Sequence, residues 1–323
     1  MNTIISTDVS LAAKLIKEGE TVAFPTETVY GLGANAFDAE AVKKIFAAKN
    51  RPADNPLIVH LADKNAISSV AAFVPDTAYM LMEKFCPGPL TIVLNKKDTI
   101  PDVVTAGLKS VGIRFPSHPT ARKFLSECAL PVAAPSANRS TRLSPTTAEA
   151  VFEDMDGKIP LILDGGHCGV GIESTVLSLV TPKPYILRPG IITLSMIKTV
   201  LPEAENYVSK NVSDVPSPGV RHKHYAPTVE FSLFDGFEAI SLAYDAYVKC
   251  GMNPVIVCLE KNMLLYNGKN VVSAGENTTE VAKNIFDLLR RLEKKYDAIL
   301  SEKFGFDEVG LSVMNRLNMA AKK

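Results

Sequence analysis

A polar segment from about Glu203 to Pro227 divides the chain, and it constrains the fold more than any other feature. Most of it, the stretch ENYVSKNVSDVPSPGVRHKHYAP from Glu205 to Pro227, has three prolines and little apolar periodicity, whereas regular apolar patterns lie on both sides. Such a composition is typical of a linker. A chain of 323 residues is also too long for one typical core. We therefore predict a first domain over residues 1–205, a linker over 206–227 and a second domain over 228–323.

Strands and helices follow one another in the first domain without strict alternation. The runs Thr21–Phe24, Leu90–Asn95 and Val132–Ala134 have the length and apolar content of buried strands. Ala39–Ala48 repeats apolar residues at helical spacing. This order predicts an α/β domain built on a twisted mixed sheet.

Beyond residue 228 the alternation is more regular. A strand at Val229–Phe234 precedes a helix at Phe237–Cys250, and a strand at Val255–Leu259 precedes the long amphipathic stretch Thr278–Lys295. Strand–helix alternation predicts a small parallel, Rossmann-like sheet. No GxGxxG motif occurs there, so the pattern does not indicate nucleotide binding by this domain.

Charge and cysteine content exclude several classes of protein. Lys plus Arg and Asp plus Glu number 35 each, which leaves no overall field for a nucleic acid or an anionic membrane. The five scattered cysteines form no CxxC pair, which disfavours a disulfide framework or a structural zinc site. The start MNTIISTDVS lacks a signal-peptide pattern, and no apolar stretch is long enough to span a bilayer. We expect a cytoplasmic protein with no membrane partner.

Polar side chains gather where the predicted strands end. Ligand crevices in α/β sheets lie at strand ends, although turns there commonly carry polar residues as well. The residues in question are Thr26, Glu27, Thr28, His60, Arg114, Ser136, Asn138 and Arg188.

Some candidate residues have a structural as well as a functional interpretation. Lys49 lies near a helix C-terminus, where its positive charge interacts favourably with the helix dipole. Its alternative role is to bind a polyphosphate together with Arg51. His60, between two apolar residues, is typical of a half-buried, hydrogen-bonded histidine. His222 and His224 lack a third zinc ligand. The residues alone indicate a two-domain α/β protein with a cation-lined crevice and no identified substrate.

Several stretches together resemble the YrdC-like family, specifically its two-domain threonylcarbamoyl-AMP synthases. They cover most of residues 20–192, and the linker motif SPGVRHKHYAP and the end GLSVMNRLNMAA resemble the two-domain subgroup. The matching stretches are FPTETVYGLGANA, KIFAAKNRPADNPLIVHLAD, PGPLTIVL, VGIRFPSHP, PVAAPSANRSTRLSPTTAE, DGGHCGVGIESTVLSL and LRPG.

This resemblance implies both a fold and a reaction. The fold is a twisted α/β sheet with a concave, positive cavity, followed by a Rossmann-like domain. The reaction joins L-threonine, bicarbonate/CO2 and ATP into threonylcarbamoyl-adenylate and pyrophosphate. A separate transferase then places the threonylcarbamoyl group on an adenosine of tRNA.

The resemblance also implies site residues. Lys49 and Arg51 correspond to groups beside the phosphates, Mg²⁺ accompanies ATP, and the protein itself supplies no metal site. The linker, through His224 and Tyr225, resembles a lid over the nucleotide. The implied threonine site comprises Thr28, His60, Arg114, Ala134 and Ser174. The implied ATP site comprises Arg51, Asn55, Ser110, Ser136, Asn138, Ser144 and Arg188.

Two other functions are compatible with parts of the sequence. A non-catalytic RNA-binding protein would use the basic residues Arg139, Arg142, Arg221 and Lys223, but the neutral net charge argues against it. A carbamoyl-transfer enzyme with another acceptor, as in hydrogenase maturation, would carry acylphosphatase-like and zinc-finger modules, and neither is apparent.

Overall fold

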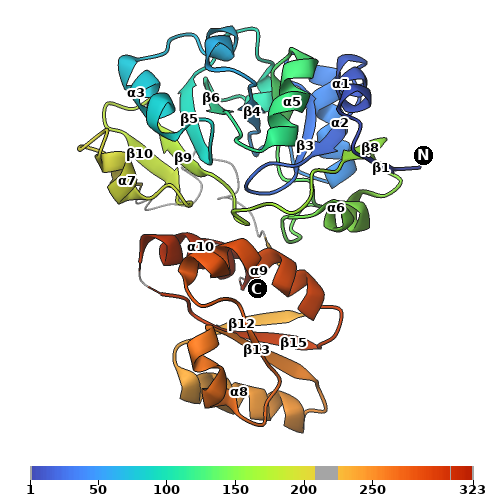
Figure 1. Ribbon diagram of the computed structural model, residues 1–323, viewed down its shortest axis with the longest axis vertical. Coiled ribbons are helices and arrows are strands. Elements are labelled where there is room, and N and C mark those ends of the chain that lie inside the picture. Colours follow the sequence, from blue (N-terminus) through green and yellow to red (C-terminus); the bar gives the residue numbers. More distant parts are fainter. Residues whose placement is uncertain (1, 208–224, 306, 322–323) are drawn as a thin grey trace. The chain divides into compact units, whose positions relative to one another are not determined.

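The computed structural model describes residues 2–207, 225–305 and 307–321. By their contacts, 2–140 and 145–207 form one compact unit, and 141–144 with the residues from 225 onward form a second (Figure 1). Most of the predicted linker, His224 included, lies outside the described residues. Its action as a lid therefore stays a prediction.

A mixed sheet forms the centre of the first unit. Among the described residues it has eleven strands, in the order β1-β8-β2-β3-β7-β4-β6-β5-β9-β10-β11. β4 runs parallel to β6 and antiparallel to β7, so the predicted mixed sheet is confirmed. The strands are β1 (Ile4–Ser6), β2 (Val22–Phe24), β3 (Gly31–Asn35), β4 (Ile58–His60), β5 (Leu90–Asn95), β6 (Ser110–Arg114), β7 (Val132–Ala134), β8 (Leu161–Leu163), β9 (Thr175–Ser178), β10 (Tyr185–Arg188) and β11 (Glu205–Asn206).

Helices bury both faces of this sheet. Val22 and Phe24 of β2 pack with α1 and α5, whereas Ala23 between them belongs to the core that includes α2. Alternate residues of a strand point to opposite faces, and burial on both sides explains why β2 is apolar throughout. The helices are α1 (Val9–Lys17), α2 (Ala39–Lys49), η1 (Lys64–Ser69), α3 (Asp76–Phe85), α4 (Asp102–Thr105), α5 (Pro119–Cys128), α6 (Ala148–Met155) and α7 (Leu194–Lys198).

Strand β3 was not predicted, because its sequence GLGAN is typical of a turn. It pairs with β2 and β7, and a Cβ on Gly33 would lie 2.7 Å from Val132 Cγ1 and 2.9 Å from Phe24 Cε1. Glycine is therefore needed for the strand to pack closely against these side chains. The same glycines lower the β-propensity that a sequence pattern can detect.

The second unit contains a parallel sheet of four strands among the described residues, in the order β12-β15-β13-β14. Helix α8 lies on one side of it, and α9 and α10 lie on the other (Figure 1). The predicted small parallel, Rossmann-like domain is confirmed. Its elements are β12 (Glu230–Phe234), α8 (Phe237–Lys249), β13 (Pro254–Cys258), η3 (Glu260–Tyr266), β14 (Val271–Ser273), α9 (Thr278–Leu292), β15 (Ala298–Glu302) and α10 (Glu308–Ala320).

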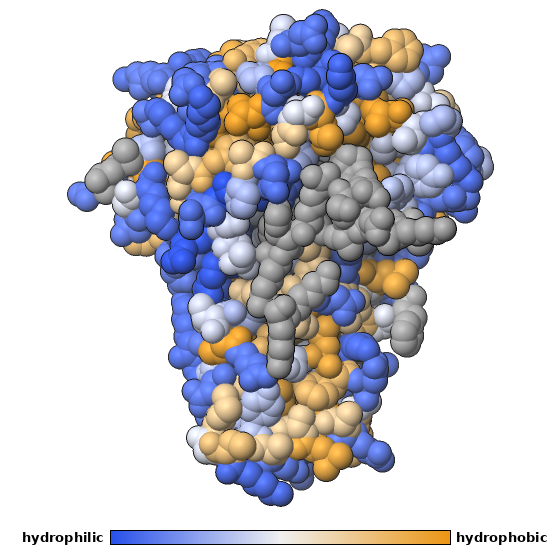
Figure 2. Space-filling view, turned by 180° about the vertical axis from the view of Figure 1, so that it is seen from behind, coloured by the Kyte–Doolittle hydropathy of each residue, from blue (hydrophilic) through white to orange (hydrophobic). Residues whose placement is uncertain are grey.

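None of the helices in the described parts of the chain is long and apolar enough to cross a membrane. Figure 2 shows hydrophilic side chains interspersed with apolar ones over one face of the molecule.

Gly190 follows β10 at a point where no side chain fits. A Cβ there would lie 2.5 Å from the backbone nitrogen of Thr175, which donates to Pro89 O. We predict that Gly190→Ala lowers the free energy of unfolding by about 2 kcal/mol and the thermal midpoint by about 4–8 °C. Gly169→Ala is the matched control, because a Cβ on Gly169 meets nothing within 4 Å. Equal midpoints for the two variants in a thermal melt would contradict this prediction.

Candidate active site

Three neighbouring strands place polar residues in one row across the sheet. His60 of β4 is opposite Arg114 of β6, and Arg114 is opposite Thr91 of β5. Opposite residues on adjacent strands point to the same face. All three side chains are buried. The sequence indicated His60 and Arg114, but Thr91 lies within the apolar run LTIVLN and gave no signal.

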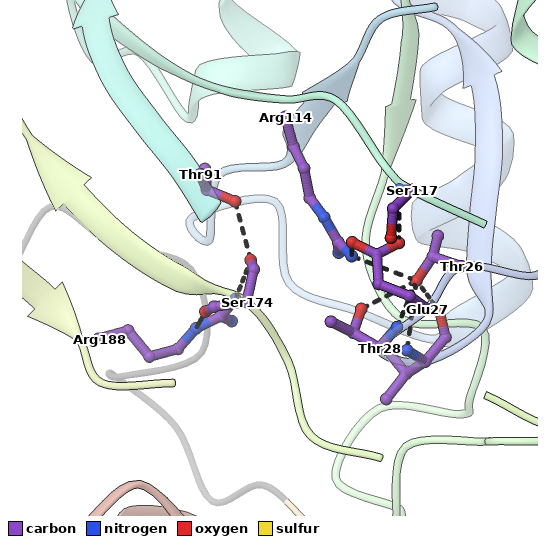
Figure 3. A network of polar contacts seen from close by, with 9 residues as sticks. Thr26, Glu27, Thr28, Thr91, Arg114, Ser117, Ser174 and Arg188 are labelled. Carbon is purple, nitrogen blue, oxygen red and sulfur yellow. Dashed lines mark hydrogen bonds and ion pairs between the residues drawn. The ribbon is translucent and has the colours of Figure 1, made fainter. Parts of the chain in front are cut away.

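Glu27 is the ion-pair partner of Arg114. Its Oε1 lies 2.8 Å from Arg114 Nη2, and its Oε2 accepts a hydrogen bond from the Ser117 backbone N–H at 3.0 Å (Figure 3). Arg114 Nη2 also donates to Thr26 Oγ1 at 3.5 Å. Glu27 was noted in the sequence only as a polar residue at a strand end, because nothing in the pattern shows which cation it meets.

Thr26 organises the turn that carries Glu27 and Thr28. Its Oγ1 accepts from the N–H groups of Thr28 and Val29 at 3.2 and 3.3 Å and donates to Val29 O at 2.7 Å. Thr28 Oγ1 lies 2.8 Å from Thr26 Oγ1, so the predicted threonine-site residue lies beside the ion pair (Figure 3). These contacts fix the turn without a regular secondary structure.

Ser174 connects Arg188 to the row. Arg188 donates to Ser174 O from Nε at 3.2 Å and from Nη2 at 3.0 Å, and Nη2 also reaches Ser174 Oγ at 3.2 Å (Figure 3). Ser174 Oγ lies 2.8 Å from Thr91 Oγ1. A residue predicted for threonine therefore lies in one network with a residue predicted for ATP.

Lys49 fastens the loop that follows β7. Its Nζ donates to Ser136 O at 2.6 Å and to Asn138 O, and the Ser140 N–H donates back to Lys49 O at 2.9 Å. Lys49 ends α2, as expected, but it is buried rather than exposed at the helix end. Burial holds the pKa of Lys49 well below its ordinary value, and Arg51 lowers it further. A nearby polyphosphate would favour the charged form.

His60 is neutral in this environment. Burial lowers the pKa of His60 to about 3, and the neighbouring Arg114 contributes to that decrease. Its Nδ1 lies 3.2 Å from Ile58 O, and its ring packs edge-on against Phe24, with 5.6 Å between ring centroids. The hydrogen bond that its apolar neighbours suggested is present, but the residue is fully buried rather than half-buried, and it lies in the row with Arg114.

The remaining predicted residues fall in three places. Arg51 Nη2 donates to Asn55 O at 3.2 Å, which brings two residues of the predicted ATP site together. Ala134 ends β7, and Ser110 begins β6. Ser144 and Tyr225 belong to the second unit, where Tyr225 stacks on Phe286. Their part in a nucleotide site stays a prediction, as does that of His224, which lies outside the described residues.

Two family models match consecutive parts of the chain. The model described as "Telomere recombination" matches residues 14–190, and the model described as "Threonylcarbamoyl-AMP synthase, C-terminal domain" matches residues 192–322. This chain belongs to the threonylcarbamoyl-AMP synthase family. The resemblance noted in the sequence is thereby confirmed.

Full-length relatives support this family assignment. The threonylcarbamoyl-AMP synthase of Bacillus subtilis is 45% identical over 322 residues, which span 97% of this chain and 92% of the relative. That of Pyrococcus abyssi is 41% identical, with 97% and 94% covered. A crystal structure of a P. abyssi protein complexed with L-threonine matches with a TM-score of 0.91 at 40% identity, covering 99% of this chain and 97% of that one.

The depressed pKa of His60 predicts a pH dependence of stability. The unfolded chain protonates this histidine near pH 6.5, whereas the folded chain does so only near pH 3. The free energy of unfolding is therefore highest, as far as His60 is concerned, above about pH 6.5, and it decreases as the pH falls toward about 3. Between about pH 6.5 and pH 4, wild-type protein should lose up to about 1.4 kcal/mol per pH unit more than His60→Gln. Unfolding free energies measured across this range test the prediction, and parallel pH profiles would contradict it.

Proposed function

We propose that the protein joins L-threonine, bicarbonate/CO2 and ATP into threonylcarbamoyl-adenylate and releases pyrophosphate. The product is the activated intermediate for threonylcarbamoyladenosine in tRNA. The observation that carries the proposal is the buried row of His60, Arg114 and Thr91, joined to Ser174 and Arg188, on the fold of the threonylcarbamoyl-AMP synthase family.

Arg114 is the group suited to the carboxylate of threonine. A guanidinium binds a carboxylate with charge-assisted, often paired hydrogen bonds. His60 is opposite Arg114 on the neighbouring strand, and Thr28 Oγ1 contacts Thr26 Oγ1, which accepts from Arg114. Thr28 and neutral His60 can exchange hydrogen bonds with a hydroxyl group without adding charge. The P. abyssi relative of the same architecture was crystallised with L-threonine, which supports threonine as a substrate of this protein.

Lys49 and Arg51 are the groups suited to the phosphates of ATP. They follow one another closely at the end of α2, and each lies in the electrostatic field of the other. The described residues contain no cluster of three or more His, Cys, Asp or Glu side chains that could hold a metal ion. Since Mg²⁺ is commonly held by substrate phosphates and water, we propose that it arrives as part of the nucleotide substrate.

The reaction requires positioning and electrostatic stabilisation rather than a covalent enzyme intermediate. The carbamate of threonine attacks the α-phosphorus of ATP, and negative charge grows on the departing pyrophosphate, where Lys49 and Arg51 would stabilise it. Burial raises the pKa of the Cys168 thiol to about 12, so this thiol is a poor nucleophile at neutral pH. Exclusion of water would protect the labile carbamate and the mixed anhydride.

The alternative as a non-catalytic RNA-binding protein has less support. Arg142, one of its proposed contacts, forms a partly buried ion pair with Glu293 within the second unit, with 2.6 Å between Nη2 and Oε1. A cation already neutralised in this way contributes little to phosphate binding. Arg221 and Lys223 lie outside the described residues.

We propose two further properties of this enzyme. Threonylcarbamoyl-adenylate is a reactive mixed anhydride, so a downstream tRNA threonylcarbamoyl transferase must use it. The reaction of this protein itself requires no direct contact with RNA. A cytoplasmic location is supported by the cysteines, all five of which are free thiols.

The direct test is release of pyrophosphate by the full chain supplied with ATP, Mg²⁺ and bicarbonate. We expect release that depends on L-threonine and stops when bicarbonate is withheld. Serine and valine, which each lack one part of the threonine side chain, are the matched control substrates and should be used less well. Folded protein that releases no pyrophosphate in response to threonine would contradict the proposed function.

Two substitutions separate the predicted subsites. Arg114→Ala should raise the KM for threonine by about 100-fold and change the KM for ATP by less than about threefold, because the substrate contact that is lost involves only the threonine carboxylate. Arg51→Ala should have the reverse effect. Steady-state kinetics with each substrate varied in turn provide the measurement. If Arg114→Ala raises the KM for threonine and the KM for ATP equally, the assignment of Arg114 is wrong.

A further inference from the structure

Two atoms of one buried ion pair have no hydrogen-bond partner among the described residues. They are Nε of Arg114, a donor, and Oε1 of Glu27, an acceptor. The side chains are only 4% and 11% exposed. Oε1 lies 2.8 Å from Arg114 Nη2, but the contact lacks the alignment of a hydrogen bond.

Neighbouring groups hold the pair in this arrangement. The Ser117 N–H binds Glu27 Oε2, and Thr26 Oγ1 accepts from Arg114 Nη2, so each charged group is anchored through an atom other than the unpartnered one (Figure 3). A buried polar atom without a partner costs about 1–3 kcal/mol. An arrangement that retains two such atoms on two groups in direct contact indicates that a ligand supplies their missing partners.

The two atoms together indicate which chemical groups the ligand carries. A buried donor requires an acceptor and a buried acceptor requires a donor, and the two lie on groups in direct contact. An α-amino acid carries a carboxylate and an ammonium on one carbon atom, so it presents an acceptor and a donor at a similarly short separation. We propose that Glu27 binds the ammonium group of the amino acid substrate while Arg114 binds its carboxylate. This inference rests on the proposed function and adds Glu27 to the residues that contact threonine.

Charge balance supports the same assignment. Arg114 and Glu27 together are neutral, and His60 beside them carries no charge at neutral pH. A zwitterion has no net charge and leaves the buried site balanced, whereas a hydroxy acid without the amino group would bring an unpaired negative charge next to Glu27. The pair therefore selects free α-amino acids over the corresponding carboxylic acids.

Ligand binding to the full chain without ATP tests the proposal independently of catalysis. The probes are L-threonine, 3-hydroxybutanoate, which lacks the ammonium group, and threoninol, which lacks the carboxylate. Titration calorimetry measures each dissociation constant for wild-type protein, Glu27→Gln and Glu27→Asp. Glu83→Gln, at an exposed position in α3, is the matched control, and thermal melts verify that each variant is folded.

We expect wild-type protein and Glu83→Gln to bind threonine more tightly than either analogue. Glu27→Gln should weaken the binding of threonine by about 10- to 100-fold, because the ammonium group loses its partner. The binding of 3-hydroxybutanoate, which has no ammonium group, should be unchanged or tighter. Glu27→Asp should retain part of the preference for threonine, since it keeps the charge.

Each other outcome overturns the proposal. Unchanged threonine binding by Glu27→Gln would exclude an ammonium contact. Equal losses for threonine and 3-hydroxybutanoate would mean that Glu27 only positions Arg114. Failure of the wild-type protein to bind threonine would overturn both this inference and the proposed function, whereas the first two outcomes leave the proposed function intact.

Discussion

The buried ion pair between Glu27 and Arg114 is the interaction on which the site depends. Two charges are removed from water there, and one partner alone would be strongly unfavourable. The pair joins the last residue of β6 to the turn after β2, which are separated in the sheet by several strands. It therefore fixes the turn of Thr26 and Thr28 against the sheet, and under the proposed function it also sets the charge that threonine would meet.

The mixed topology of the sheet explains why distant segments meet at this point. Parallel β4 and β6 end side by side and bring His60 next to Arg114, while antiparallel β5 begins there and supplies Thr91. Ser174, directly before β9, extends this row through its contact with Thr91, and Arg188 of β10 donates hydrogen bonds to it. Lys49 performs a separate task, because it ties the end of α2 to the loop after β7. The side chains of this network and Lys49 thus rest on strand and helix ends of the first unit, as precise positioning of a substrate would require.

Much of the fold was predictable, because burial leaves a clear pattern in short apolar strands and amphipathic helices. Strands such as Leu90–Asn95 and Val132–Ala134 have the predicted limits. β3 was missed because the glycines that allow its close packing also resemble a turn. The site was predictable only in part. Family motifs indicated Arg114 and His60, whereas the role of Glu27 depends on a contact across the sheet that neither spacing nor periodicity encodes.

A crystal structure of the protein with L-threonine bound would test the central claim most directly. The account predicts the threonine carboxylate on the Arg114 guanidinium, its Nε included, and the ammonium on Oε1 of Glu27, with Ser117 still bound to Oε2. Threonine bound elsewhere in the first unit, with Glu27 and Arg114 contacting only each other, would contradict it.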